Sequence, residues 1–170
     1  MKYEDIPKFP HANYKVNIPF NQIERWISEN EKHFDVQIQP DFQRGYVWSE
    51  FQQTSYLEFL LREGRSGKDI LWNVTNWMNG NEGKEMVLVD GQQRLGAVRK
   101  FMRNELKVFG FLKNEFEGKF PILQYDLVFH VNNPKTKKEV IEWYLALNTG
   151  GSIHTKEDLK PAYDILKTLK

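Results

Sequence analysis

The run Asp90-Gly91-Gln92-Gln93-Arg94 gathers charged and amide side chains in one short stretch. Four apolar residues, 86–89, precede the run, and apolar residues at helical spacing follow it to about residue 104. This order predicts a buried strand, a tight turn at the glycine and the first turn of a helix. Because the start of a helix offers unpaired N–H groups and a positive dipole end, the run predicts an anion or nucleotide site.

Arg94 is the most informative residue of this run. An ordinary structural interpretation makes Asp90 a helix cap and Arg94 a solvated residue of the first turn. A cation in the first turn opposes the helix dipole, however, and a guanidinium can hold a phosphate through two N–H groups. On these residues alone, the structural and the anion-binding interpretations both stay open.

The segment 42–48, Phe-Gln-Arg-Gly-Tyr-Val-Trp, has no clean period and reads as an ordered loop rich in aromatic residues. We expect at least Phe42 and Trp48 to fill the core. Arg44 has two interpretations: a structural cation–π pair with a neighbouring ring, or a contact to a second phosphate while an aromatic ring stacks on a base.

The segment Asn148-Thr149-Gly150-Gly151 follows an apolar helical pattern and precedes Thr155. From spacing alone, a helix C-terminus and linker is the favoured interpretation, because glycines accept left-handed conformations. The alternative is a glycine loop whose backbone N–H groups line a phosphate pocket.

Several other sites are excluded. The segment 64–68, GRSGK, resembles a P-loop, but its glycines are too close together and it leads from a helix into a strand, so we predict a turn. The histidines lack the spacing of metal ligands. The chain contains no cysteine, which excludes disulfides, zinc–thiolate sites, iron–sulfur clusters and a cysteine nucleophile.

Composition indicates an ordered globular protein. The 170 residues suit one domain, and an aromatic content of 14% argues against disorder. The net charge of +1 provides no field that would hold duplex DNA, although a local basic patch is compatible with it. Residues 1–10 lack the apolar region of a signal peptide, and no apolar run is long enough to span a bilayer. We therefore expect a cytoplasmic protein without membrane contact.

The elements that must position these residues mix helices and strands without regular alternation, which predicts an α+β fold. Capping boxes at Ser49/Gln52 and Thr136/Glu139 start two of the helices, and Thr155 caps a third. We expect strands at 14–18, 33–39, 69–77, 85–89 and 122–131, and helices at 19–30, from 50, 92–104, from 137 to 147, and from 156.

Some local details are less regular. The turn signal at 79–83 predicts that the strands on either side of it form a hairpin. Segments 106–112 and 116–120 are ambiguous, strand fragments being one interpretation. Pro161 fits the last helix only near its first turn.

Three segments carry a family resemblance: FQRGYVW at 42–48, VDGQQRL at 89–95 and LNTGG at 147–151. In this order they resemble the N-terminal domain of GmrSD-type modification-dependent restriction enzymes, a DGQQR-motif domain (domain of unknown function 262). The similarity spans about residues 15 to 165. It implies a ParB/sulfiredoxin-like α+β fold with a small mixed sheet and helices packed around it. The whole chain, 1–170, would be one such domain, with 1–13 as an N-terminal extension.

The resemblance also implies a function. In relatives, the DGQQR element is linked to nucleotide binding and hydrolysis that regulates or powers action on phage DNA. Carried onto this chain, it makes Asp90, Gln93 and Arg94 candidates for hydrolysis, and Asp90 the candidate Mg²⁺ ligand. The implied contacts to the nucleoside triphosphate are Gln43, Arg44, Gly91, Gln92, Arg94, Asn148, Gly150 and Gly151.

The chain departs from the family pattern in two ways. Longer members continue into a helical region and a His-Asn-His nuclease domain, which are missing here, and Gly45 stands where proline is common. We therefore expect a nucleoside triphosphate-binding domain with weak or partner-stimulated triphosphatase activity, in restriction or phage counter-defence, rather than a nuclease. The alternatives are a ParB-like DNA-binding or nicking module, and a catalytically silent interaction protein that binds a nuclease-bearing partner.

Overall fold

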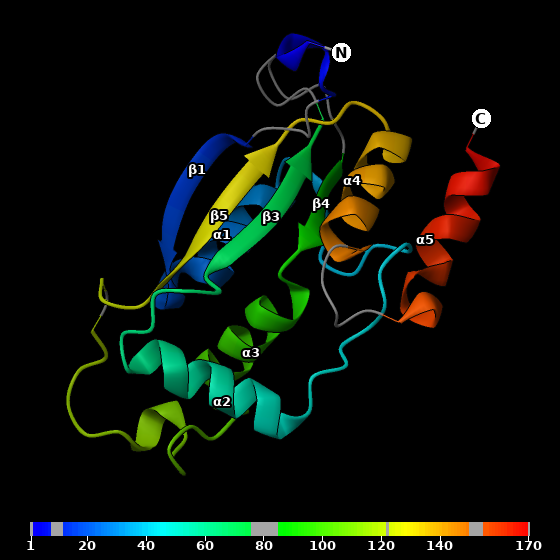
Figure 1. Ribbon diagram of the computed structural model, residues 1–170. Helices are drawn as coiled ribbons and strands as arrows, with labels where there is room; N and C mark the ends of the chain where they lie inside the picture. The colour runs from blue at the N-terminus through cyan, green and yellow to red at the C-terminus, as the bar shows by residue number, and fades with distance from the viewer. Residues whose placement is uncertain (1, 8–11, 76–84, 122, 150–154, 170) are drawn as a thin grey trace.

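A five-stranded mixed sheet with helices on both faces forms the centre of the computed structural model (Figure 1). The structure describes residues 2–7, 12–75, 85–121, 123–149 and 155–169. This architecture confirms the α+β expectation. No helix in these described ranges is long and apolar enough to cross a membrane.

The strands pair in the order β1-β5-β3-β4-β2. Neighbours β1 and β5 run antiparallel, as do β3 and β4, whereas β5–β3 and β4–β2 are parallel. The antiparallel β3–β4 pair confirms the predicted hairpin, although its turn at 79–83 lies outside the described residues. The strands are β1 (Ala12–Pro19), β2 (Asp35–Gln37), β3 (Asp69–Val74), β4 (Glu85–Asp90) and β5 (Asp126–Asn132).

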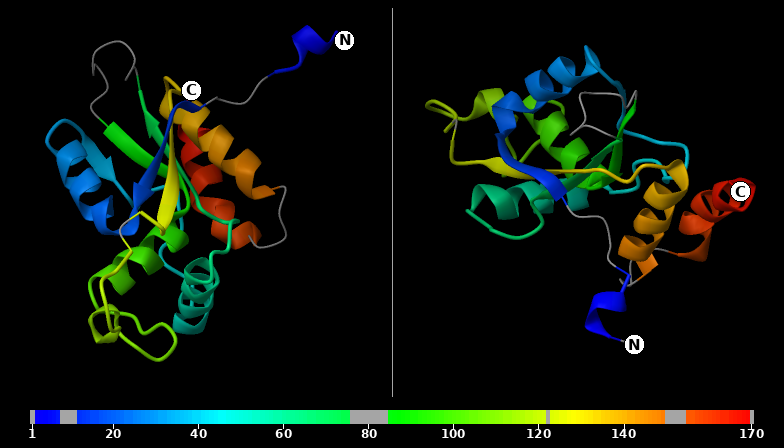
Figure 2. Two further views of the ribbon diagram at one scale, coloured as in Figure 1. Left: turned by 90° about the vertical axis from the view of Figure 1, so that its left-hand side faces the viewer. Right: turned by 90° about the horizontal axis from the view of Figure 1, so that it is seen from above.

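Two apolar cores lie on opposite faces of this sheet, as Figure 2 shows by the helices on either side. One core joins the sheet to α1, α2 and α3, and its centre is the fully buried Trp72, whose ring lies near those of Trp26 and Phe129. The second core joins the sheet to α4 and α5. The helices are α1 (Ile23–Glu31), α2 (Glu50–Leu61), α3 (Gln92–Met102), α4 (Lys137–Thr149) and α5 (Lys156–Thr168).

Strand β4 is buried on both faces, which explains its unbroken apolar sequence. Met86 and Leu88 belong to the core beneath α1 and α3, while Val87 and Val89 belong to the core beneath α4 and α5. The predicted buried strand before Asp90 is therefore confirmed.

The capping boxes form as predicted. In the first, Ser49 Oγ accepts a bond from the Gln52 N–H and Gln52 Oε1 accepts one from the Ser49 N–H. Thr136 and Glu139 make the same reciprocal pair at the start of α4. These bonds satisfy N–H groups that have no partner within the helix, and so they set where each helix begins.

The strand boundaries differ from the sequence prediction. β1 begins at Ala12, inside the expected N-terminal extension; β2 is shorter; β3 ends at Val74; and β5 begins only at Asp126. The segments 106–112 and 116–120 contain no strand. They hold a single bridge between Val108 and Phe111 and a 3₁₀ turn at Lys113–Glu115. Buried Leu106 and Val108 anchor this loop in the core without a ladder.

Two helix predictions also need correction. α4 runs on to Thr149 instead of ending before Asn148, whose side chain is buried and donates to the Tyr144 carbonyl one turn back. Pro161 is inside α5, beyond its first turn. The helix continues through the proline because Leu159 and Ala162 are buried in the core shared with α4.

Candidate functional site

A cavity of about 270 Å³ opens at the end of β4, where the polar run begins. The loop 42–48, the run Asp90–Arg94 and the last turns of α4 line it together. The structure thus brings segments far apart in the sequence to one place. The lining residues are Gln43, Arg44, Trp48, Val89, Asp90, Gly91, Gln92, Gln93, Arg94, Tyr144, Leu147 and Asn148.

Gly91 makes the tight turn between β4 and α3. It is the N-cap of α3 and has a φ of 98°, in the left-handed region that side chains disfavour. A Cβ at this position would lie 2.6 Å from Ile70 Cδ1 and 3.1 Å from the Asp69 carbonyl oxygen. The glycine is therefore required both by its backbone conformation and by the close approach of β3.

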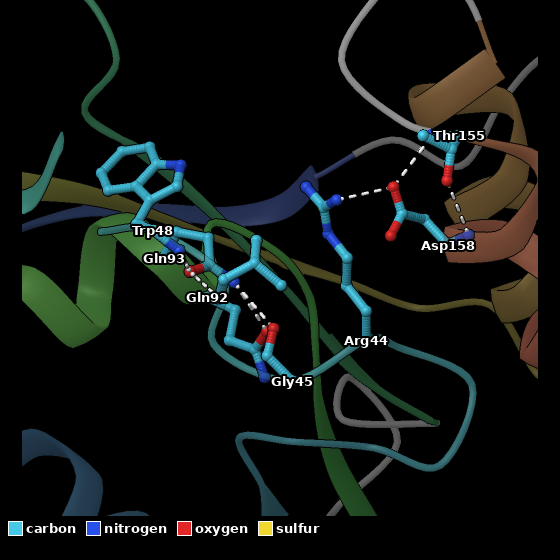
Figure 3. Close-up of polar contacts among 8 residues, drawn as sticks. Arg44, Gly45, Trp48, Gln92, Gln93, Thr155 and Asp158 are labelled. Carbon is cyan, nitrogen blue, oxygen red and sulfur yellow. Dashed lines mark hydrogen bonds and ion pairs between the residues drawn. The ribbon is translucent and has the colours of Figure 1, made fainter.

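Gln93 fastens the loop 42–48 to α3. Its Oε1 accepts bonds from the N–H groups of Val47 and Trp48, at 3.0 and 3.1 Å, and its Nε2 donates to the Gly45 carbonyl at 3.1 Å (Figure 3). Both ends of the amide are thus bonded to backbone. The structure places this expected catalytic residue in a loop-holding position.

Gln43 fixes the same loop to β4. Its Nε2 donates to the carbonyls of Leu88 and Val89, at 2.6 and 2.8 Å. Next to it, Phe42 is buried as predicted and packs on the Tyr144 ring. Trp48 differs from its prediction, because it is half-buried, lines the cavity and packs edge-on against Tyr56 of α2.

Both cavity arginines are paired with aspartates. Arg94 Nη2 lies 2.5 Å from Asp90 Oδ2, and Arg44 Nη1 lies 2.8 Å from Asp158 Oδ2. The local positive charge is therefore compensated inside the chain. Asp158, in the first turn of α5, was not predicted as a site residue. Its Thr155 capping pattern was visible in the sequence, but its proximity to Arg44, 114 residues away, was not.

Within the part of the chain that the structure describes, two buried donors in the cavity wall have no acceptor: Gln92 Nε2 and Arg94 Nε. Gln92 is only 5% exposed, so water does not readily replace the missing bond. An unsatisfied buried donor costs about 1–3 kcal/mol. Such groups are uncommon in folded proteins, and a ligand that brings acceptor oxygens is one explanation for them.

Comparison with known families identifies the family of the chain. The family model described as the GmrSD restriction endonuclease, N-terminal domain, matches residues 23–127, more than half of the chain. The chain belongs to this family. No curated protein and no solved structure matches it.

The match is shorter than the resemblance seen in the sequence. In this GmrSD N-terminal domain, the matched residues include the loop 42–48 and the run Asp90–Arg94, but they end before α4 and α5. The wall formed by Tyr144, Leu147 and Asn148 therefore lies beyond the match. The ParB/sulfiredoxin relationship is not tested by it and stays a prediction.

The α4 wall combines apolar and polar groups. Asn148 is buried, and its Nδ2 is bonded to the Tyr144 carbonyl. Burial raises the pKa of Tyr144, Arg44 opposes this rise, and the weaker effects of the Asp90 and Asp158 charges add to it. Tyr144 consequently keeps its proton near neutral pH and remains a hydrogen-bond donor. Gly150 and Gly151, expected to contact phosphate, lie outside the described residues.

Asp90 alone does not make a metal site. In the described ranges, no group of three histidine, cysteine, aspartate or glutamate side chains is placed to hold a metal ion. Mg²⁺, however, often binds through one or two carboxylates, with water and substrate phosphates completing its shell. The single carboxylate of Asp90 therefore suits Mg²⁺ only when a phosphate-bearing ligand and water supply the remaining oxygen ligands.

Proposed function

We propose that this GmrSD N-terminal domain binds a nucleoside triphosphate in the cavity at the end of β4. The observation that carries the proposal is the pair of buried donors, Gln92 Nε2 and Arg94 Nε, in a cavity that Arg44 also lines. Phosphate oxygens supply the acceptors that these donors lack. They also suit the N-terminus of α3, whose first N–H groups have no partner within the helix.

The site residues divide by role. Arg94 and Arg44 contact phosphate, since a guanidinium holds phosphate oxygens through parallel N–H bonds. Gln93 and Gln43 position the loop 42–48, because their amides are already bonded to backbone. The aromatic ring of Trp48 suits a base, which stacks on aromatic faces.

The size of the cavity limits what it encloses. At about 270 Å³ it is slightly smaller than most ligand pockets, which run from roughly 300 to 1,000 Å³. It therefore holds part of a nucleotide, with the remainder at the surface or admitted by movement of the walls.

Hydrolysis by this site would be weak or would need a partner. Phosphoryl transfer depends on positioning and charge neutralisation. Bound Mg²⁺ would supply part of that neutralisation. Asp90 is the residue to hold the ion or orient water, and it can do so once Arg94 turns from the carboxylate to the phosphate. Since the aspartates cancel the charge of the arginines in the free chain, intrinsic activity should be low.

Thermal unfolding with ATP, GTP, CTP and UTP, each with and without Mg²⁺, tests binding. At about 100 times its Kd, a ligand adds about 2.7 kcal/mol of stability, which raises Tm by roughly 5–10 °C in a domain of this size. We expect a shift with at least one triphosphate, and its loss in Arg94→Ala. Arg103→Ala is the control, because it removes an arginine at the far end of α3. If no nucleotide stabilises the unmodified chain, the binding proposal is wrong.

The second candidate function is action on DNA. It is favoured by the family, because the family is named for a restriction endonuclease. The net charge of +1 argues for a partner that supplies most of the DNA contacts. A gel-shift titration of the isolated chain at several salt concentrations separates the possibilities. Binding that weakens steeply with salt would indicate direct phosphate contacts, whereas unchanged mobility at low salt would contradict DNA binding by this chain alone.

A further inference from the structure

The ion pair between Arg44 and Asp158 joins the cavity to a helix beyond the family match. Arg44 lies on the loop 42–48 and lines the cavity, while Asp158 lies in the first turn of α5 (Figure 3). The two side chains are 19% and 23% exposed, so water screens the 2.8 Å contact only partly. The contact is therefore a real restraint between the loop and α5.

Asp158 has two partners. Its Oδ2 accepts from Arg44 Nη1 and also from the Thr155 N–H at 2.9 Å, while the Asp158 N–H donates to Thr155 Oγ1. The bond from the Thr155 backbone is the main cause that lowers the pKa of Asp158, and Arg44 lowers it further. If Arg44 turned away, the carboxylate would keep its capping bonds. Breaking the ion pair does not leave Asp158 without a partner.

Asp158 also occupies the donors that a ligand needs. A guanidinium that already holds a carboxylate has fewer N–H groups free for a phosphate. Because Asp158 belongs to the same chain, it competes at a high effective concentration. A phosphate that binds at Arg44 must therefore displace it.

We propose that Asp158 is an internal competitor for the phosphate site, which holds Arg44 in the free chain and releases it when a triphosphate binds. The inference rests on the proposed function and adds its regulation. A ligand in the cavity would break the ion pair that joins the loop 42–48 to α5. Binding would therefore change how α5 is held, outside the cavity. The opposing model is a fixed brace, in which the ion pair keeps Arg44 oriented for the ligand.

Asp158→Asn separates the two models. The substitution removes the charge, but an asparagine Oδ1 can still accept from the Thr155 N–H, so the cap of α5 is kept. Asp164→Asn is the matched control, since Asp164 lies on the same helix and pairs with Lys167 in an exposed contact. The probes are inorganic tripolyphosphate and the triphosphates of the thermal screen, and calorimetry measures Kd.

Competition predicts that Asp158→Asn binds tripolyphosphate about tenfold tighter, as expected if displacing one charge-assisted hydrogen bond is no longer needed. Asp164→Asn should stay within about twofold of the unmodified chain. Equal or weaker binding by Asp158→Asn, with the control unchanged, would overturn the inference and favour the brace.

Failure of the proposed function gives a different result, because neither the unmodified chain nor Asp158→Asn would then bind any triphosphate. The competition model would be wrong as well.

A second measurement follows the Asp158 carboxylate itself. In an NMR titration, saturating tripolyphosphate should raise the pKa of Asp158 towards its ordinary value, since Arg44 is withdrawn. An unchanged pKa in the saturated protein would contradict displacement.

Discussion

Both ends of the Gln93 amide are bonded to the backbone of the loop 42–48, whereas the buried Gln92 Nε2 has no acceptor among the described residues. Adjacent and chemically identical side chains thus have different roles. The sequence predicts that the polar run clusters at a turn, but it cannot say which amide faces the loop. That choice depends on where the loop 42–48 returns, 45 or more residues earlier in the chain.

The turn at Gly91 leads to a prediction at the residue scale. Gly91→Ala should reduce the free energy of unfolding by about 2–4 kcal/mol, because it combines left-handed backbone strain with a collision against Ile70. Gly110→Ala has a positive φ but open space, and should cost only about 1 kcal/mol. Gly45→Ala lies on the cavity loop with open space and no positive φ, and should stay within about 0.5 kcal/mol.

Urea unfolding of the three variants measures these differences. The decisive comparison is between Gly91→Ala and Gly110→Ala, since both carry the backbone strain but only the first carries the collision. Equal losses would mean that β3 moves away from residue 91 at little cost.

Among the elements, α1 and α3 are joined by a three-residue ion cluster. Glu24 of α1 accepts from Arg99 Nε at 2.7 Å, from Arg99 Nη2 at 3.1 Å and from Arg103 Nη2 at 2.9 Å. The two arginines lie four residues apart and so share one face of α3. The sequence shows that shared face, but only the packing of α1 against the sheet identifies its partner.

Glu24→Gln tests this cluster through pH. Burial raises the pKa of Glu24, but the hydrogen bonds and charges of Arg99 and Arg103 together outweigh it, so the net pKa is lowered from 4.5. A lowered pKa in the folded state stabilises above the unfolded value and is lost as pH falls through the folded value. We expect Glu24→Gln to lose about 1 kcal/mol at pH 7, allowing for partial exposure, and this loss to shrink as pH falls from 4.5 through the lowered pKa of folded Glu24.

Unfolding free energies measured between pH 3 and 8 check this. Glu29→Gln is the control, because Glu29 is on the same helix but pairs with Lys32 in an exposed contact. It should change Tm very little at any pH. A Glu24→Gln deficit that persists unchanged at pH 3 would show that the carboxylate charge is not the cause.

At the scale of the whole molecule, the two cores differ in how they connect to the sheet. Leu57 of α2 is fully buried in the core around Trp72. Leu159 of α5 is buried in the other core, where α4 lies between α5 and the sheet (Figure 2). Damage to the first core should therefore spread through the sheet, whereas damage to the second should open α5 first.

Native-state hydrogen exchange distinguishes the two cases. Leu57→Ala should reduce the protection of the β3, β4 and β5 amides by about 2–5 kcal/mol, the usual cost of a buried leucine. Leu159→Ala should reduce the protection of α5 by a similar amount and leave the sheet amides largely unchanged. Equal losses in α5 and the sheet would show that α5 is part of the global cooperative unit.

The sequence by itself determined the elements that rest on local rules: the strand–glycine–helix junction at Asp90–Arg94, the capping boxes, the β3–β4 hairpin and the α+β class. It also carried the family resemblance, since the matched residues include both the loop 42–48 and the polar run. Periodicity, capping and turn chemistry depend on neighbours within a few residues, which a sequence displays directly.

The tertiary structure decided which of these parts meet and what their side chains do there. The sequence made Arg44 and Arg94 candidate phosphate contacts, and only the fold showed that Arg44 is held by Asp158, 114 residues away. The extension of α4 through Asn148 and the irregular loop after α3 were likewise settled by burial against distant elements. Where a side chain's partner lies on a distant segment, packing between the segments chooses it, and no local pattern encodes that choice.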